Sequence, residues 1–376
     1  MSKRGNGEGC VTHRADGRWA AVISVPGPAG SRRRKTFYGK TRAEVSAKMT
    51  KGLGDLQVGI EPLDERTTVK RFLTSWLEDT VKPNRRESTY NGYESNVRLH
   101  LVPAIGNLAL ARLTPAHVRR MMEAQLKSGL SPRSVQYIRA VLRVALKQAE
   151  ADGIVHRNAA ALAPGPTVRR TEIRPLTPQQ VKLFLAGVGT DRLSALYVVA
   201  FTTGLRQSEI LGLRWEDVDL DAGTLRVAQT LQRGAGVRYG SPKSDRSRRT
   251  LMLAGFISEA LKGHRTRQLE ERFRADSEWQ DYGLVFTTRF GTPVDHRNIG
   301  RYFHAHLKRL GLPAQRFHDA RHACATFLLS QGVELRVIQE ILGHSQIGIT
   351  ANLYSHVMPA LQRAAMVHID KAFSEL

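Results

Sequence analysis

The sequence reads Phe317-His318-Asp319-Ala320-Arg321-His322, later Leu342-Gly343-His344, and then Tyr354-Ser355-His356. His318 and Arg321 are three residues apart, so they share one face if their segment is helical. His344 follows a Leu-Gly turn signal, and Tyr354 comes ten residues after it. We therefore expect two histidines, an arginine and a tyrosine to converge on one point. They offer hydrogen-bond donors for an anion and a hydroxyl nucleophile, a combination that suits phosphoryl transfer.

A second cation and a proton donor are found upstream of this stretch. Thr203-Gly204-Leu205-Arg206 follows an apolar segment with helical spacing and interrupts it with a glycine. An arginine at a helix start can present its guanidinium to a phosphate beside the helix dipole, and Glu209 is one turn away to orient it. Lys243 lies between two short predicted strands, where a hairpin could bring its ammonium group to a leaving oxygen. The expected catalytic set is Arg206, Lys243, His318, Arg321, His344 and Tyr354.

The charge of the chain indicates a polyanionic partner, with nucleic acid as the first choice. There are 57 Lys and Arg residues against 34 Asp and Glu residues, a net charge of +23, and the sequence pI is about 10.6. The excess is +8 over residues 1–60, +8 over residues 65–160 and +9 over residues 161–376. This even spread favours a long DNA track over one patch on a membrane. A basic protein without a special partner is the alternative.

Length and residue usage limit the class of protein further. A chain of 376 residues is expected to form two or three domains. Its two cysteines, Cys10 and Cys324, cannot make a disulfide framework and suit a reducing cytosol, and Cys324 is expected to be a small buried residue. The first residues are polar and glycine-rich rather than typical of a signal peptide. The sequence has no run of about 18 apolar residues, so no membrane span is expected.

Residues 1–60 form the first predicted unit, which has a thin core. Trp19 to Val25 is rich in β-prone residues, a Pro-Gly turn follows, and Arg32 to Tyr38 is a basic strand with two aromatic residues. A capped helix is expected from Arg42 to Leu53. The basic strand could enter a DNA groove, or its aromatic residues could pack on the helix. The DNA-binding candidates of this unit are Arg32, Arg33, Arg34 and Lys35.

Residues 65–160 are predicted to form a compact bundle of four helices. Apolar residues at helical spacing and Thr-Pro or Ser-Pro starts indicate helices over 67–78, 88–101, 115–127 and 133–151. Pro103 is expected to end the second helix. Each basic residue on these helices could belong to a solvated face, but the set supports DNA binding. The candidates are Arg119, Arg120, Arg133 and Arg139.

A linker rich in proline is predicted over residues 161–175, and the last unit, residues 172–376, follows it. Helices of this unit are expected over 178–187, 191–203 and 206–214 and again from Gly255. Short strands are expected over 224–231, 237–239 and 249–253. The sequence therefore predicts a mostly α protein with small β-sheets, of the α+β class.

Together these residues resemble the tyrosine recombinases, and among them the phage-type integrases. Six residues occur in the family's order, within strings that are also similar to the family's: Thr-Gly-Leu-Arg-x-x-Glu, His-Asp-x-Arg-His and Leu-Gly-His-Ser. The likeness covers about residues 172–365. Residues 65–155 are similar in pattern to the family's helical, SAM-like core-binding domain, and residues 11–60 look like its three-stranded arm-binding domain. Ala320 and Ala323 stand where larger residues are common.

The resemblance implies a site-specific recombinase that cuts and rejoins DNA through a 3′-phosphotyrosine intermediate to integrate or excise a phage or integrative element. Tyr354 would be the nucleophile, His318 the general base and Lys243 the acid for the departing 5′-oxygen. The two arginines would stabilise charge at phosphorus, and His344 would add a hydrogen bond. Because these cations replace a metal, no metal or other cofactor is expected.

The same resemblance implies the partners and the location. The expected partners are double-stranded DNA attachment sites, three further copies of the chain in a tetramer on a Holliday junction, an excision factor and a host DNA-bending protein. The expected location is the bacterial cytoplasm, at the nucleoid when the protein is bound, without a membrane partner. An apolar stripe in residues 359–376 could dock on a neighbouring protomer or on its own domain.

Three other functions remain open from the residues. His318 and His322 have the spacing of two zinc ligands, with Asp319 in place of the usual glutamate base. Arg321 between them would repel a cation, so His322 is better explained as a core histidine. A sequence-specific DNA-binding or architectural protein fits the charge equally well but has no need of Tyr354. A type IB topoisomerase would use the same phosphotyrosine step.

Overall fold

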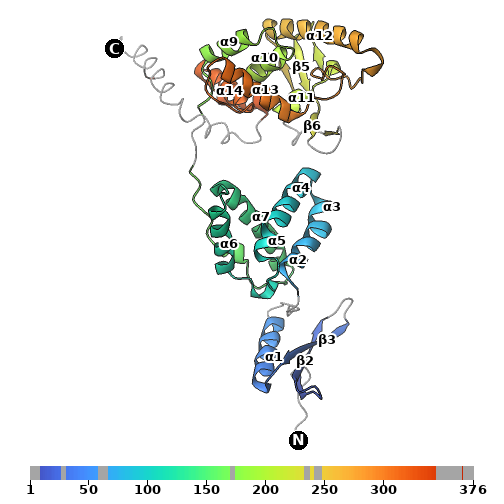
Figure 1. The fold of residues 1–376 in the computed structure, drawn as a ribbon, viewed down its shortest axis with the longest axis vertical. Helices are drawn as coiled ribbons and strands as arrows, with labels where there is room; N and C mark the ends of the chain where they lie inside the picture. Colours follow the sequence, from blue (N-terminus) through green and yellow to red (C-terminus); the bar gives the residue numbers. More distant parts are fainter. Residues whose placement is uncertain are drawn as a thin grey trace, which may run out of the picture. The chain divides into compact units, whose positions relative to one another are not determined.

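The computed structural model describes residues 9–26, 31–57, 67–169, 174–232, 238–240, 248–343 and 366. The chain divides after Arg170 into two compact units, Met1–Arg170 and Thr171–Leu376 (Figure 1). This boundary lies inside the predicted linker over residues 161–175. The predicted division of the first unit into 1–60 and 65–160 stays a prediction. Within the described ranges, no helix combines the length and the apolar character needed to cross a membrane.

The chain starts with a three-stranded antiparallel sheet, in the order β1-β2-β3, against which one helix packs. The elements are β1 (Cys10–His13), β2 (Trp19–Pro26), β3 (Arg32–Gly39) and α1 (Arg42–Gln57). Ala21, Ile23 and Val25 alternate along β2 and are buried, so one face of the sheet forms the core. Phe37 packs on α1, where a Cβ on Gly52 would be 2.7 Å from the Phe37 ring. The two strands and the helix are confirmed, whereas the short β1 was not located from its sequence.

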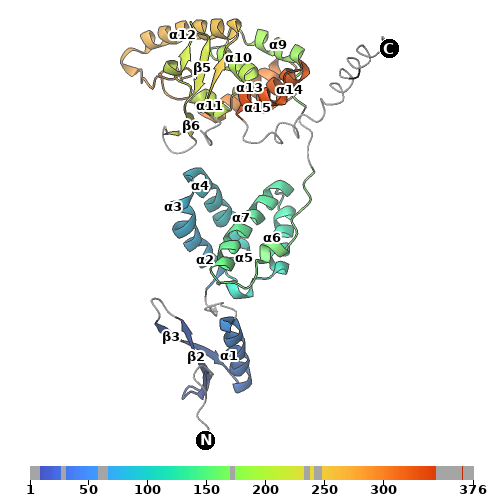
Figure 2. The same ribbon diagram turned by 180° about the vertical axis from the view of Figure 1, so that it is seen from behind.

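The helical part of the first unit has its own core, formed by buried residues between Val69 and Ala163. Its helices are α2 (Val69–Ser75), α3 (Lys82–Asn84), α4 (Glu87–Asn96), α5 (Val102–Ile105), α6 (Pro115–Lys127), α7 (Pro132–Ala151) and α8 (Ala159–Leu162). The Thr-Pro and Ser-Pro starts are confirmed. The Thr114 hydroxyl accepts the His117 N–H, and the Ser131 hydroxyl accepts the Ser134 N–H. Figure 2 shows α6 and α7 from behind.

Two prolines in this part, Pro83 and Pro103, lie inside continuous helical backbone, so the expected end of the helix at Pro103 is wrong. In the turn Val97–Leu101, just before Pro103, the helix widens and its hydrogen bonds reach back five residues instead of four. The same widening, over Trp76–Val81, precedes Pro83. A proline ring normally clashes with the carbonyl group four residues earlier. A wider π-type turn moves this carbonyl aside, which explains why the helix continues.

The second unit combines helices with two small antiparallel sheets. Its sheets have the orders β4-β5-β8 and β6-β7. The helices are α9 (Pro178–Gly187), α10 (Ser194–Thr203), α11 (Gln207–Leu211), α12 (Gly255–Ala275), α13 (His296–Arg309), α14 (Asp319–Ser330) and α15 (Leu335–Leu342). The strands are β4 (Val218–Asp219), β5 (Thr224–Val227), β6 (Thr230–Gln232), β7 (Arg238–Gly240) and β8 (Arg249–Met252). The predicted α+β class is confirmed.

The alternating segment 224–231, expected to be one strand, is split between the two sheets. Its first part is β5 and its second part is β6. The chain changes direction because β6 lies directly against the turn after α11, where a Cβ on Gly212 would be 2.7 Å from the Leu231 nitrogen. The Gln229 amide, in the break between the strands, donates to the Gly212 carbonyl over 3.0 Å.

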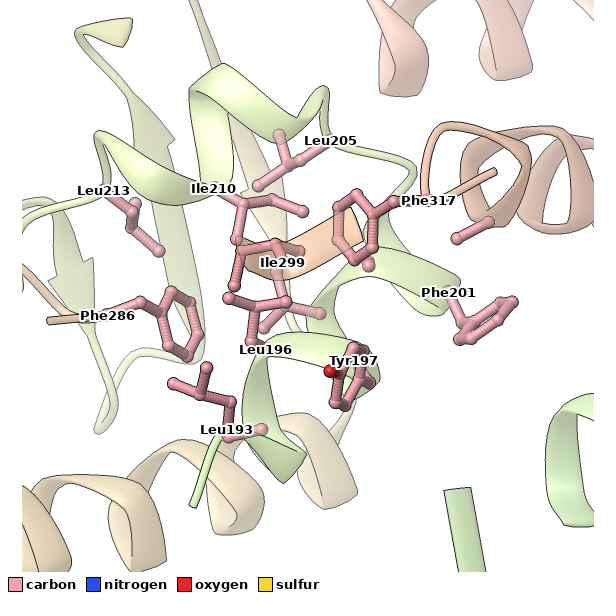
Figure 3. Packing of buried hydrophobic residues seen from close by; sticks show 14 of the residues in the cluster. Leu193, Leu196, Tyr197, Phe201, Leu205, Ile210, Leu213, Phe286, Ile299 and Phe317 are labelled. Atoms are coloured by element: carbon pink, nitrogen blue, oxygen red, sulfur yellow. The ribbon is translucent and has the colours of Figure 1, made fainter. Parts of the chain in front are cut away.

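The helix α10 forms the centre of the second core. It is apolar all round and has buried side chains on every side, as expected of a helix enclosed by other elements. Its contacts include α12 and α14. In Figure 3 its residues Leu196, Tyr197 and Phe201 lie among side chains of several other segments, Phe317 included. The C-terminal end of α10 is thereby held in a fixed place, and the next residues lead to Arg206.

We expect Phe303→Ala to destabilise the second unit by about 3–5 kcal/mol, because it removes a fully buried ring and leaves a cavity. The Phe303 ring lies 5.2 Å from that of Phe184 and 5.6 Å from that of Phe317. Chemical denaturation of the full chain measures the change. Phe273 is 87% exposed, and Phe273→Ala is the control, expected to change the free energy of unfolding by less than about 0.5 kcal/mol. Equal effects of the two substitutions would contradict the assigned core.

Candidate active site

The turn after α10 has to contain glycine. Gly204 has a φ of +61°, in the left-handed region, and a Cβ there would lie 2.4 Å from Leu342 Cδ2. The turn therefore packs directly against α15, which ends at Leu342. Arg206 follows in an extended conformation just before α11. This local geometry is the one that the Thr-Gly-Leu-Arg string predicted.

The Glu209 carboxylate is buried in the core and binds Arg206 through two hydrogen bonds. Glu209 Oε2 accepts the Arg206 backbone N–H at 3.0 Å, and Oε1 accepts Arg206 Nη1 at 2.6 Å. The Glu209 side chain is only 1% exposed, whereas the Arg206 side chain is 33% exposed. Arg206 Nη2 also donates to the Gly343 carbonyl at 2.9 Å. The guanidinium is thus oriented on two sides and still reaches solvent.

Arg249 is a second arginine on the same carboxylate, and the sequence reasoning missed it. Arg249 Nη2 lies 3.2 Å from Glu209 Oε2, and Arg249 Nε donates to the Ile341 carbonyl at 2.6 Å. Burial alone would raise the pKa of Glu209, but the charges of Arg249 and Arg206 and the hydrogen bonds from Arg206 bring it below its usual value. A usable signal existed in the sequence. Arg249 has the same strand parity as Leu251, so the alternation of a strand places this charged residue on the apolar face of β8.

Arg321 approaches the same turn from α14. It is 3% exposed, and its Nη1 donates to the Gly204 carbonyl at 2.7 Å. Small side chains next to it in sequence, Ala320 and Ala323, are buried with it. Arg206 and Arg321 are therefore brought together by one turn, although 115 positions separate them in the sequence. Their joint role at a phosphate stays a prediction.

His318 lies at the start of α14 and keeps an exposed surface. Its ring is perpendicular to that of His322, with 5.3 Å between the centroids. Partial burial removes water from the imidazole and, together with the charges of His322 and Arg321, lowers the pKa of His318 to about 4. The imidazole is therefore neutral near pH 7 and can accept a proton.

The acidic residue of the pattern His-Asp-x-x-His has a structural partner. The Asp319 carboxylate accepts the Arg316 backbone N–H and the Arg316 Nη2, both at 2.9 Å, so it is engaged within the fold. In the part of the chain that the structure describes, His, Cys, Asp and Glu side chains form no group of three that could hold a metal ion. His322 is 8% exposed, and it belongs to the buried face of α14.

Cys324 is a packing residue, as expected. It is 3% exposed, and its Sγ donates to the Thr202 carbonyl at 3.3 Å. Burial raises the pKa of its thiol to about 12, which keeps it protonated and unreactive.

Three members of the expected catalytic set lie outside the described residues, and their roles stay predictions. They are Lys243, His344 and Tyr354. The chain positions that flank two of them are described. Gly343, which precedes His344 in the sequence, accepts Arg206 Nη2, and β7 and β8 flank the segment that contains Lys243.

Most of the expected DNA-binding residues are available at the surface. Exposed side chains are found at Arg32, Arg33, Arg34, Arg119, Arg120 and Arg133. Lys35 is half-buried on β3. Arg139 has a structural task instead, because its Nε donates to the Ala163 carbonyl at 2.6 Å and its Nη2 to the Ala161 carbonyl. Contacts of these residues with DNA stay predictions.

The arrangement around Gly204 is suited to binding a phosphate. The Arg321 guanidinium binds the Gly204 carbonyl, Arg206 follows the same turn two residues later, and a neutral imidazole lies on the helix that carries Arg321. Guanidinium groups form strong, directed hydrogen bonds to phosphate oxygens and stabilise negative charge that develops there.

Known proteins resemble this chain over most of its length. The sequence matches the phage integrase family over residues 174–360 and the N-terminal SAM-like domain of phage integrases over residues 68–124. It is 30% identical over 360 residues to a tyrosine recombinase XerC-like protein of Caldanaerobacter subterraneus subsp. tengcongensis, covering 90% of this chain and 92% of that protein. The chain belongs to the phage integrase family of tyrosine recombinases. Its predicted class, an enzyme that cleaves and rejoins DNA, is confirmed.

Solved integrase structures share the fold of this tyrosine recombinase. The Tn1549 transposon integrase in complex with a circular intermediate DNA has a TM-score of 0.68 and 22% identity, covering 80% of this chain and 99% of that chain. A lambda integrase tetramer bound to a Holliday junction has a TM-score of 0.56 and 17% identity, covering 89% of this chain and 95% of that chain. The predicted architecture is confirmed by these likenesses.

We expect DNA cleavage by this recombinase to stay constant from pH 7.5 down to about pH 5 and to fall only below it. The reason is that the pKa of His318 is about 4 in the free protein, so the ring stays unprotonated where an ordinary histidine, with a pKa of ~6.5, would be charged. The measurement is the pH dependence of the second-order rate of cleavage at low DNA concentration.

This measurement needs a check on folding. The pKa of buried His264 is also about 4, below the ~6.5 of a histidine in the unfolded chain. The free energy of unfolding therefore decreases as the pH falls from ~6.5 toward 4. The folded fraction is therefore followed by circular dichroism at each pH. Half-maximal cleavage at pH 6.5 in fully folded protein would contradict the assignment of a neutral, low-pKa base.

Proposed function

We propose that this tyrosine recombinase is a site-specific integrase, which inserts and excises a phage or integrative element at defined DNA sites. The observation that carries the proposal is the turn at Gly204, which accepts Arg321 and leads into Arg206, whose guanidinium Glu209 fixes. A buried carboxylate that orients a solvent-accessible arginine is a costly arrangement. This cost is explained if the arginine has to bind a phosphate in one fixed geometry.

The proposed reaction forms one phosphoester bond as it breaks another. The Tyr354 oxygen attacks phosphorus, and the bond from phosphorus to the 5′-oxygen breaks. The 3′-phosphotyrosine ester that forms conserves the bond energy for rejoining. A phenol titrates near pH ~10, so neutral His318 accepts its proton. Lys243 protonates the departing 5′-oxygen, and His344 donates a hydrogen bond to the phosphate. The two arginines stabilise the charge at phosphorus, the task that a metal ion has in many nucleases.

The proposed substrate is a pair of double-stranded DNA attachment sites. The exposed arginines on β3, α6 and α7 and the net charge of +23 support a long contact with the phosphate backbone. The related lambda integrase has been solved as a tetramer on a Holliday junction, which supports a homotetramer on DNA for this chain too. An excision factor and a host DNA-bending protein complete the proposed partners, and the bacterial cytoplasm, at the nucleoid, is the proposed location.

A DNA-binding protein without cleavage activity is the second candidate, because the basic surface suits it equally. The buried Glu209 with its two arginines disfavours it, since DNA contacts alone do not need a buried ion pair. A type IB topoisomerase is the third candidate. It would relax supercoiled DNA of any sequence, whereas an integrase joins defined sites.

Tyr354→Phe is expected to abolish the covalent adduct with DNA and to leave DNA binding within about twofold, because it removes only the attacking oxygen. The substrate is a nicked attachment site, on which the adduct accumulates, and denaturing gel electrophoresis measures it. Binding is measured by gel shift. An adduct formed by the variant would show that the nucleophile is another residue.

Binding without cleavage by the wild-type protein would favour the architectural function, and loss of cleavage in EDTA would favour a metal site.

Deletion of residues 1–60 is expected to abolish binding to flanking arm sites and to spare binding to the core site. This follows if the sheet β1-β2-β3 contacts DNA independently of the helical part. Fluorescence anisotropy with separate arm-site and core-site duplexes measures both affinities. As a control on charge alone, Lys48→Gln in α1 should leave arm-site binding nearly unchanged. Loss of both affinities on deletion would contradict the proposed division at residue 60.

A further inference from the structure

Arg249 shares the buried carboxylate of Glu209 with Arg206. The three groups come from different elements, because Arg249 is on β8, Glu209 is in α11 and Arg206 precedes α11. The Arg249 side chain is only 8% exposed, and burial lowers its pKa in spite of the Glu209 charge. The arginine is therefore held inside the protein, next to the residues that meet the phosphate.

The charges of this group determine how strongly Arg206 can attract an anion. A single pair of Arg206 and Glu209 would be neutral, and the carboxylate would largely cancel the field of the guanidinium. With Arg249 on the second oxygen of Glu209, two positive charges surround one negative charge. The group then has a net charge of +1, and Arg206 can attract a phosphate.

The same two arginines fix the C-terminal end of α15. The last carbonyl groups of a helix have no partner within it. Arg249 Nε donates to the Ile341 carbonyl at 2.6 Å, and Arg206 Nη2 donates to the Gly343 carbonyl at 2.9 Å. Each arginine therefore connects Glu209 with the end of α15. Movement of Arg249 would shift both supports of the Arg206 guanidinium.

We propose that Arg249 is a positioning residue for DNA cleavage, which keeps Arg206 oriented and positively charged toward the scissile phosphate by compensating Glu209. The inference rests on the proposed function, because it presupposes a phosphate at Arg206. Arg249 itself does not touch the phosphate and acts through Glu209 and the end of α15.

The test compares two nicked attachment-site substrates that differ by one charge. One has a normal scissile phosphodiester, and the other has a neutral methylphosphonate at the same position. With the phosphodiester, Arg249→Met in the full chain should form the covalent adduct about 10- to 100-fold more slowly than wild type. With the methylphosphonate, which needs less positive charge, the deficit should shrink to less than about threefold. Arg249→Lys keeps the charge and should recover most of the rate.

Arg192 supplies a matched control at the other end of α10. Its guanidinium also binds one carboxylate, that of Glu271 at 2.5 Å, and one backbone carbonyl, that of Thr287 at 2.6 Å. Arg192→Met and Arg249→Met should both lower thermal stability, but Arg192→Met should leave the cleavage rate of the folded protein unchanged. The ratio of the two substrate rates within one variant is independent of how much of the protein is folded.

Each outcome decides the proposal. An equal deficit of Arg249→Met on both substrates, without recovery in Arg249→Lys, would show a merely structural role and overturn the inference. So would a wild-type rate on the phosphodiester, or the same substrate ratio in Arg192→Met. Failure of the wild-type protein to form any adduct would overturn the proposed function itself, and the inference with it.

Discussion

The carboxylate of Glu209 is the constraint on which the rest of the second unit depends. A carboxylate with 1% exposure is stable only if its lost hydration is replaced by charges and hydrogen bonds of good geometry. Arg206 and Arg249 replace it from two different segments of the chain, and both also bind the end of α15. The polar group therefore fixes the mutual position of β8, α11 and α15, around the place where the site is built.

Small residues make this polar centre possible inside an apolar core. Gly204 allows α10 to end in contact with Leu342 of α15, where a Cβ would overlap it. Ala320 and Ala323 join the apolar core on α14, while Arg321 of the same helix donates to the Gly204 carbonyl. The central helix α10 then holds the turn in place through its packing on all sides (Figure 3). An apolar core and a cationic site thus share one turn of the backbone.

The sequence predicted those features whose cause is local. The Thr-Pro and Ser-Pro starts became capped helices because a hydroxyl and a proline act within one turn. The predicted strand 224–231 is divided in the structure, because contact with Gly212, at the end of another element, redirects the chain. Pro103 did not end its helix, because a wider turn before it absorbs the clash. Arg249 was missed, because its partner Glu209 is 40 positions away in the sequence.

By itself, the sequence determined the family, the order of the candidate active-site residues and the start of most helices, because motifs and caps consist of residues that are close together in the sequence. Only the tertiary structure decided that Arg206 and Arg321 share one turn and that His318 is neutral near pH 7. It also decided that Glu209 is bound by two arginines rather than one. Burial and charge at a point in space depend on segments that meet only when the chain has folded. The stretch from Phe317 to Tyr354 thus indicated the type of reaction from the sequence. Only the fold showed that Gly204 and Glu209 determine where the arginines lie.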